Sequence, residues 1–316
     1  MTRKERKGSP APGRRGRALR PATLSVLVAL AKTGFLQSPL EGQSVRYSGA
    51  LQYITGSYVF DARSHSFSLS SGLTLDVGPF DASLSVPVIL RNGGVLTTVG
   101  DRLMPTGGEG HGVVAGRRSG DRIRTHDGGG MGPGNGMHQD PDSTVRFSDA
   151  YVFRIGDPFL RASGQILGAR GRLRSLRATG GVKVPATDLD SGVGTGEWDY
   201  TLGASATVLL GSLFLMGDAG YWWFGDLPDL ELRDGLSWGA ALAGFVFDRR
   251  VSLMATVSGS SRPIRTLDPP LNLGVAAGFR LTGEWSGSAG VSAGLTESAA
   301  DLALYLGWSR SLRDGF

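Results

Sequence analysis

Residues 65–76 read HSFSLSSGLTLD, and all the apolar side chains of this stretch stand at odd-numbered positions. Small polar residues and glycine separate four apolar ones, Phe67, Leu69, Leu73 and Leu75. Side chains repeat with a period of two along a β-strand, so this alternation places the apolar residues on one face and the polar residues on the other. The stretch therefore predicts a strand that separates an apolar environment from a polar one.

The same alternation recurs to the end of the chain. It is regular at 82–90, 174–184, 197–208, 251–259, 271–282, 285–296 and 301–309, and less regular at 47–60, 158–168, 212–224 and 236–247. These segments give about twelve strands of about ten to thirteen residues, which is the length that crosses a bilayer at a tilt. The sequence predicts an all-β fold: a closed, antiparallel, up-and-down transmembrane β-barrel of about 12 strands.

The lengths of the connections alternate as well. The predicted tight turns are 77–81, 169–173, 211, 248–250 and 283–284, and the other connections are mostly longer: 61–64, 91–157, 185–196, 225–235, 262–270 and 297–300. Bacterial outer-membrane barrels have short periplasmic turns and longer outer loops. We therefore assign the tight turns to the periplasmic side.

Aromatic residues form two bands on the face assigned to lipid. The predicted outer band holds Trp198, Tyr200, Tyr221, Trp223 and Trp238, and the periplasmic band holds Trp285 and Trp308. Aromatic girdles at both membrane–water interfaces are typical of membrane barrels. A soluble β-sandwich gives no reason for such banding, so the bands favour a barrel in contact with outer-membrane lipid.

Positive charge is concentrated at the N-terminus. Residues 1–20 hold eight Lys or Arg and one Glu, which leaves 25 basic and 27 acidic residues elsewhere, so a nucleic-acid-binding domain is not expected. A short apolar run at 22–31 follows, and we interpret residues 1–44 as a signal peptide and leader; the alternative is a disordered basic tail. Residues 45–316 are then the barrel of a Gram-negative outer membrane. The terminal Phe316 resembles the signal read by the barrel-assembly machinery.

The longest predicted connection includes residues 91–142, which hold fifteen glycines and show no periodicity. This composition predicts a flexible Gly-rich outer loop, and a plug that folds into the barrel is the alternative. The segment also carries three of the four histidines, His111, His126 and His138, with Asp127 and Asp140 near two of them. Their spacing matches no compact metal motif, and the chain has no cysteine. The sequence predicts no metal site, no cofactor and no catalytic residue.

Two groups of side chains fall on the predicted inner face. The charged group consists of Arg177, Lys183, Glu197, Asp199, Asp218 and Arg280. We expect Arg177 and Lys183 to lie near Glu197 and Asp199 and to brace the wall, with ion selectivity as the alternative. The second group breaks the polar pattern and predicts an apolar lumenal patch: Phe214, Met216, Trp222, Phe245 and Phe247. Such a patch fits either a path for hydrophobic ligands or a core that fills a narrow barrel.

Short motifs in the centre of the chain are Gly156-Asp157, Val182-Lys183-Val184-Pro185, Gly194-Thr195-Gly196, Asp199 and Gly220-Tyr221. They resemble those of the outer-membrane β-barrel family associated with meta-pathway phenol degradation, over about residues 150–316. Ala186-Thr187 stands where that family has Thr-Gly. The resemblance implies a barrel, distantly like the fatty-acid channels, that passes aromatic or other hydrophobic compounds. It brings no established functional residue.

We therefore predict an outer-membrane channel for passive uptake of small, hydrophobic or aromatic molecules. A structural or surface-interaction barrel without transport is the first alternative. A lipid-acting barrel enzyme is less favoured because such hydrolysis needs a nucleophile with a base, and outside residues 91–142 the only histidine is His65.

Overall fold

A computed structural model describes residues 43–107, 111–118, 120–127, 144–187, 193–227 and 229–312. Residues 42–316 form one compact unit. The predicted leader lies outside the described residues except for Gln43 and Ser44, which already belong to the first strand. Phe316, His138 and Asp140 also lie outside them.

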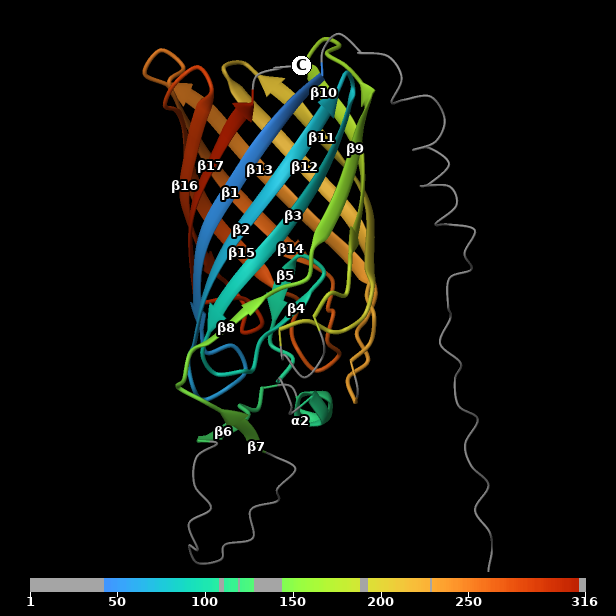
Figure 1. Cartoon of the computed structure of the whole chain (residues 1–316), viewed down its shortest axis with the longest axis vertical. Helices are drawn as coiled ribbons and strands as arrows, with labels where there is room; N and C mark the ends of the chain where they lie inside the picture. The colour runs from blue at the N-terminus through green and yellow to red at the C-terminus, as the bar shows by residue number, and fades with distance from the viewer. Residues whose placement is uncertain are drawn as a thin grey trace, which may run out of the picture. The chain divides into compact units, whose positions relative to one another are not determined.

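Twelve long antiparallel strands form the closed barrel (Figure 1). They are β1 (Gln43–Gly56), β2 (Ser64–Val77), β3 (Phe80–Arg91), β9 (Phe159–Leu167), β10 (Leu173–Lys183), β11 (Asp199–Leu210), β12 (Leu213–Trp223), β13 (Gly235–Val246), β14 (Val251–Ser260), β15 (Leu271–Arg280), β16 (Trp285–Gly294) and β17 (Leu302–Leu312). The barrel closes because β17 pairs with β1, from Val45 opposite Leu312 to Thr55 opposite Leu302. The predicted fold class is confirmed.

The register separates the two faces of the wall. Leu69 of β2 lies opposite Leu51 of β1 and Val88 of β3, and Leu51 also faces Leu306 of β17. These leucines belong to a large set of exposed apolar side chains on the outer face. Membrane barrels have an apolar outer surface of this extent, whereas soluble proteins rarely expose one to water. The alternation seen in the sequence is therefore the alternation between the outside and the lumen.

Tight turns join the strands at one end of the barrel, and longer loops join them at the other. We call these the turn end and the loop end. At the turn end, residues 78–79 and 211–212 make two-residue connections, in which Gly78 and Gly211 take φ values of 56° and 63°. Glycine adopts this left-handed backbone without the steric cost that a Cβ brings. Residues 168–172, 247–250 and 281–284 make the other three turns.

The loop end holds shorter elements of the long connection between β3 and β9. They are β4 (Thr97–Val99), β5 (Arg102–Met104), α2 (His111–Gly116), β6 (Arg124–Asp127), β7 (Thr144–Phe147) and β8 (Val152–Ile155). β4 and β5 form a hairpin, β6 pairs with β7 in parallel, and β8 extends the barrel sheet along the last residues of β3. Within the described residues, no helix is long and apolar enough to cross a membrane.

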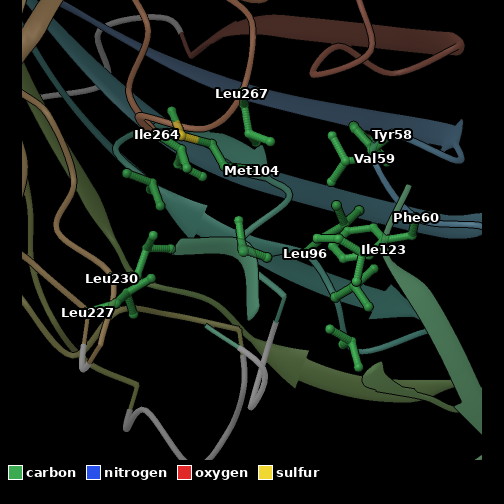
Figure 2. Packing of buried hydrophobic residues seen from close by; sticks show 14 of the residues in the cluster. Tyr58, Val59, Phe60, Leu96, Met104, Ile123, Leu227, Leu230, Ile264 and Leu267 are labelled. Carbon is green, nitrogen blue, oxygen red and sulfur yellow. The ribbon is translucent and has the colours of Figure 1, made fainter. Parts of the chain in front are cut away.

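Buried apolar residues from several loops pack together at this end, and we call this group the lid core (Figure 2). The β1–β2 loop supplies Tyr58, Val59 and Phe60. The long connection supplies Val95, Leu96, Val99, Met104, Val114, Ile123, Val145 and Phe147. The remaining members are Leu227, Leu230, Leu232, Ile264 and Leu267, from the β12–β13 and β14–β15 loops. These loops therefore form one packed layer.

One expectation differs from this arrangement. The first strand was expected at 47–60, but it ends at Gly56 because Tyr58, Val59 and Phe60 turn into the lid core. In the described part of the Gly-rich segment 91–142, Val95, Leu96 and Val114 are fully buried, because short apolar pairs between the glycines supply the packing.

A buried arginine fastens the lid. The Arg117 guanidinium follows α2, is 1% exposed, and donates to the Glu297 carboxylate at 2.8 Å and to the Thr266 carbonyl at 2.9 Å. Thr266 in turn donates from its hydroxyl to the Val114 carbonyl at 2.7 Å. These bonds connect α2 to the β14–β15 and β16–β17 loops, so the long connection is held on both sides of the mouth.

Candidate functional site

The tip of the β4–β5 hairpin lies inside the loop end of the barrel (Figure 1). Gly100 donates its backbone N–H to the Asp199 carboxylate at 2.7 Å, and Asp101 lies 3.4 Å from the Arg161 guanidinium. Both wall residues are on the inward face, at the start of β11 and in β9. The hairpin therefore occupies the lumen at the loop end of the barrel.

Gly100 packs directly against the barrel wall, and no larger residue fits there without a shift. Its φ is 62°, and a Cβ at this position would stand 2.7 Å from the Trp222 ring. Trp222 of β12 points inward, is 6% exposed, and donates from Nε1 to the Ser237 hydroxyl at 3.1 Å. The hairpin tip thus requires glycine for both its backbone conformation and its contact with the indole.

A fully buried ionic group supports the tip, and we call Lys183, Asp157, Asp199 and Thr195 the buried node. The Lys183 ammonium lies 2.7 Å from Asp199, 2.7 Å from the Thr195 hydroxyl and 3.7 Å from Asp157. Lys183 and Asp199 face each other on neighbouring strands. Buried charges are tolerated when they are paired and hydrogen-bonded, which is the case here.

Each aspartate of the buried node binds backbone as well as lysine. Asp199 accepts from Gly100 at 2.7 Å and from Gly225 at 2.9 Å, so it joins the wall, the hairpin and the β12–β13 loop. Asp157 accepts from the backbone of Ala186 and Thr187 and from the Thr187 hydroxyl at 2.7–3.0 Å. The four residues of the node are among those that carry the sequence resemblance.

The predicted lumenal charges do not form a single group. Lys183 and Asp199 pair as described, but Arg177 pairs with Asp81 of β3 instead of Glu197 or Asp199. Arg177 lies opposite Ser205, six residues along β10 from Lys183 and towards the turn end, so the expected contact was wrong. Glu197 precedes β11 and is exposed in the loop.

Asp218 and Arg280 occupy inward positions far from the buried node. Asp218 lies opposite Ser205 and Gly239, in the middle of β12. Arg280 ends β15 at the turn end, opposite Ser286.

The predicted apolar patch is divided between the two ends of the barrel. Trp222 lies at the loop end, whereas Phe214 contacts Phe245 edge-on at 5.8 Å near the turn end. Met216 is the next inward position after Phe214. Eight residues separate Trp222 from Phe214 along β12, about 26 Å at the usual rise per residue. Phe247 lies in a turn with a φ of 51° and is 77% exposed, so it does not line the wall.

Sequence reasoning missed the hairpin and its partner Arg161. The signal that could have found the hairpin is the pattern of residues 95–104. Apolar pairs there flank Gly100-Asp101, a typical turn dipeptide between two short strands. Within the described residues, no group of three His, Asp or Glu side chains could hold a metal ion.

No protein-family model and no curated protein sequence matches the chain significantly. Among solved structures, the chain is similar to the COG4313 outer membrane channel from Pseudomonas putida F1, with a TM-score of 0.56, 13% identity, and coverage of 85% of this chain and 95% of that one. A NanC porin has a TM-score of 0.47 and 8% identity, and the match covers 85% of this chain and 100% of that one. A CymD monoaromatic hydrocarbon channel has a TM-score of 0.40 and 8% identity, and the match covers 86% of this chain and 90% of that one. The first likeness shows the fold; the resemblance to the phenol-degradation family is not confirmed.

Proposed function

We propose that this chain is an outer-membrane channel for the passive passage of small molecules, with its loop-end mouth held closed by the β4–β5 hairpin. The observation that carries the proposal is the lining of the lumen. Inward positions at mid-depth are mostly small or polar: Ser48, Ser70, Ser85, Ser163, Thr179, Ser205, Gly239, Thr256, Ala276, Ser288 and Gly307. Larger side chains at inward positions nearby include Asp218 and Tyr305. Barrels of eight strands can be filled by their own side chains, but larger ones enclose cavities or channels.

The exterior supports the location. Leucines cover the outer face, and the aromatic residues of both predicted bands lie on that face by register, apart from Trp198, which precedes β11 and is exposed. Long loops face outwards in bacterial barrels, so the loop end would meet the medium and the turn end the periplasm. The wall would contact outer-membrane lipid directly.

The substrate class that we propose is small hydrophobic or aromatic compounds. Three aromatic side chains adjoin one another at the loop end: the rings of Phe159 and Trp222 are 5.8 Å apart, and those of Trp222 and Phe224 are 5.7 Å apart. The hairpin tip covers the Trp222 ring in this structure, and the three rings would offer a surface for stacking a planar apolar molecule once the tip moves away. The sequence resemblance to the phenol-degradation family supports the same class.

Conductance in planar bilayers tests the channel and its closure together. We expect low conductance from the unmodified protein and a several-fold increase when residues 97–104 are replaced by a short Gly-Ser linker. Asp199→Asn should raise the conductance as well, because it weakens the bonds to Gly100 and Lys183. Asp76→Asn is the matched control, since Asp76 is a lumenal carboxylate that pairs with Arg46 at 2.9 Å, far from the hairpin.

The outcome also decides between a channel and a structural barrel. If neither the unmodified protein nor the hairpin variant conducts, the barrel does not transport and the proposal is wrong. Uptake of labelled aromatics into liposomes tests the substrate class separately. Equal uptake of sugars and aromatics by the hairpin variant would contradict it.

A further inference from the structure

Asp218 is the central residue of β12, and its carboxylate faces the lumen of the barrel. It lies opposite Ser205 of β11 and Gly239 of β13. A Cβ at Gly239 would stand 2.6 Å from Asp218 Oδ1, so the carboxylate extends over the backbone of the neighbouring strand. Asp218 is nevertheless exposed, even though the β4–β5 hairpin occupies the loop end. Space therefore remains beside this carboxylate, halfway along the wall.

The Asp218 carboxylate has no cation beside it. Among the described residues, no lysine or arginine nitrogen lies within 4.0 Å of its oxygens. Other carboxylates on the inner face are each paired with a basic side chain: Asp76 with Arg46, Asp81 with Arg177, and Asp199 with Lys183. A charge inside a cleft with walls of low dielectric constant concentrates ions of the opposite sign. Asp218 should therefore attract cations into the lumen.

The neighbours of Asp218 in the same row of the wall supply hydrogen-bonding groups. Ser205 lies on one side, and Ser258 of β14 and Asn272 of β15 follow beyond β13 on the other. An ammonium group has three donors and no acceptor, and it is satisfied by carboxylate, hydroxyl and amide oxygens. The row therefore suits an ammonium group better than it suits an anion.

Two inward arginines could offset this negative charge, but both lie elsewhere. Arg177 is two strands away in the same row, and its guanidinium pairs with Asp81 on the side of β10 that faces away from β12. Arg280 ends β15 at the turn end, eight residues from Asn272, which is about 26 Å at the usual rise per residue. The middle of the lumen therefore keeps the negative charge of Asp218.

Apolar side chains follow Asp218 towards the turn end. Met216 is the next inward residue of β12, about 7 Å further along, and Phe214 is the one after it. Phe214 contacts Phe245 edge-on, and Phe245 is 50% exposed. A thioether and aromatic rings both make favourable contacts with the ring of another molecule. The inner face of β12 thus changes from charged to apolar over two residues.

We propose that this face binds a small aromatic ammonium ion, with the ammonium group at Asp218 and the ring against Met216 and Phe214. The inference rests on the proposed function, because it names the charge of the aromatic compounds that the channel would select. Asp218 is then the residue that determines specificity, and it favours aromatic amines over neutral or anionic aromatics.

Titration of the purified full chain in a nonionic detergent tests the site without any membrane current. The probe is 2-phenylethylammonium, 2-phenylethanol is the uncharged analogue, and calorimetry or saturation-transfer NMR reports binding. We expect saturable binding of the ammonium ion that weakens about fivefold or more in Asp218→Asn, because the variant loses the ion pair. The alcohol should bind the variant and the unmodified protein equally.

Asp248→Asn is the matched control, because Asp248 is an exposed carboxylate of the β13–β14 turn. Its φ is 52°, a conformation that asparagine tolerates, so the variant changes the same charge without strain. It should leave the binding of both probes unchanged. The shift in gel mobility on heating shows that each variant is folded.

Two further variants separate the charge from the apolar contact. Met216→Ser should weaken both probes, and a polar residue is tolerated at this position because the inward Thr207 lies opposite it. Asp218→Lys should reverse the preference, so that phenylacetate binds more tightly than 2-phenylethylammonium.

The inference is overturned if 2-phenylethylammonium shows no saturable binding, or if Asp218→Asn and Asp248→Asn affect it equally. An unchanged preference in Asp218→Lys would also contradict it. Binding with no conductance from any variant would leave this inference standing and remove the proposed channel. Conductance without binding of the ammonium ion would do the reverse.

Discussion

A lysine ammonium with no exposed surface, such as that of Lys183, depends on its partners in both directions. The pair with Asp199 satisfies the ammonium, and the ammonium is the positive charge that both buried carboxylates approach. Replacing a buried pair by apolar groups can be neutral, but removing one partner leaves the other charge without compensation. The buried node therefore acts as a unit, and Asp199 extends its influence to the hairpin.

Lys183→Met should lower the free energy of unfolding by about 3–5 kcal/mol, because the buried carboxylates of Asp199 and Asp157 lose the cation beside them. Arg46→Met is the control, since the Arg46–Asp76 pair is partly exposed and should contribute at most about 1 kcal/mol. Unfolding in urea, followed by tryptophan fluorescence, measures both. If the two substitutions lower the free energy of unfolding equally, the buried node contributes no more to stability than an exposed ion pair.

The hairpin tip gives a second test at the level of one residue. Gly100 and Gly94 both have positive φ, at 62° and 66°, but only Gly100 lies against an aromatic ring. Gly100→Ala should therefore displace the tip from Trp222 and raise conductance, whereas Gly94→Ala carries only the backbone cost of the left-handed conformation. If the two alanine variants conduct alike, contact with Trp222 does not hold the tip in place.

At the scale of elements, the lid core converts separate loops into one layer. Residues as distant as Tyr58 and Leu267 belong to it (Figure 2). Arg117 also links α2 to the β14–β15 and β16–β17 loops. Burial raises the pKa of the Tyr58 phenol well above its ordinary value, and the nearby Asp301 carboxylate raises it further. The lid core thus tolerates only the neutral phenol.

This preference sets a pH dependence for the lid. A folded-state pKa above the unfolded value of about 10 means that the stability from Tyr58 is complete below pH 10 and is lost as the pH rises beyond it. We expect the urea concentration at the unfolding midpoint to decrease when the pH is raised from 8 to 11. The decrease should be smaller in Tyr58→Phe. A variant that loses as much as the unmodified protein would assign the alkaline loss to other groups.

The sequence was most informative where the wall alternates. Leu69 and Leu73 could be assigned to lipid because one face of a membrane barrel is apolar throughout, and the turn lengths then give the topology. Tyr58, Val59 and Phe60 were placed in a strand because a run of apolar residues next to a strand has no period of its own. Arg177 could not be paired correctly, because its partner Asp81 lies two strands away and almost one hundred residues earlier.

At the scale of the whole molecule, the two faces of the wall should respond differently to the same charge. Leu306 lies on the outer face in the middle of β17, and Ser288 lies on the inner face of β16. Leu306→Arg should destabilise the barrel in lipid by about 2–4 kcal/mol, as charges do on a lipid face near the bilayer centre. Ser288→Arg should leave the stability nearly unchanged and alter ion selectivity. Unfolding in lipid vesicles and reversal potentials measure the two effects.

The seam between β1 and β17 has a consequence for how the chain folds. The free edge of Gln43–Gly56 finds its partner only when Leu302–Leu312 is available, and that strand follows every other strand of the barrel in the chain. Contacts across so much intervening sequence are slow to form, and an unpaired edge invites association with other chains. The lid core draws on loops from the whole circumference, so we expect it to condense only after the seam has closed. Acquired resistance of the lid to protease would then time the last step of assembly.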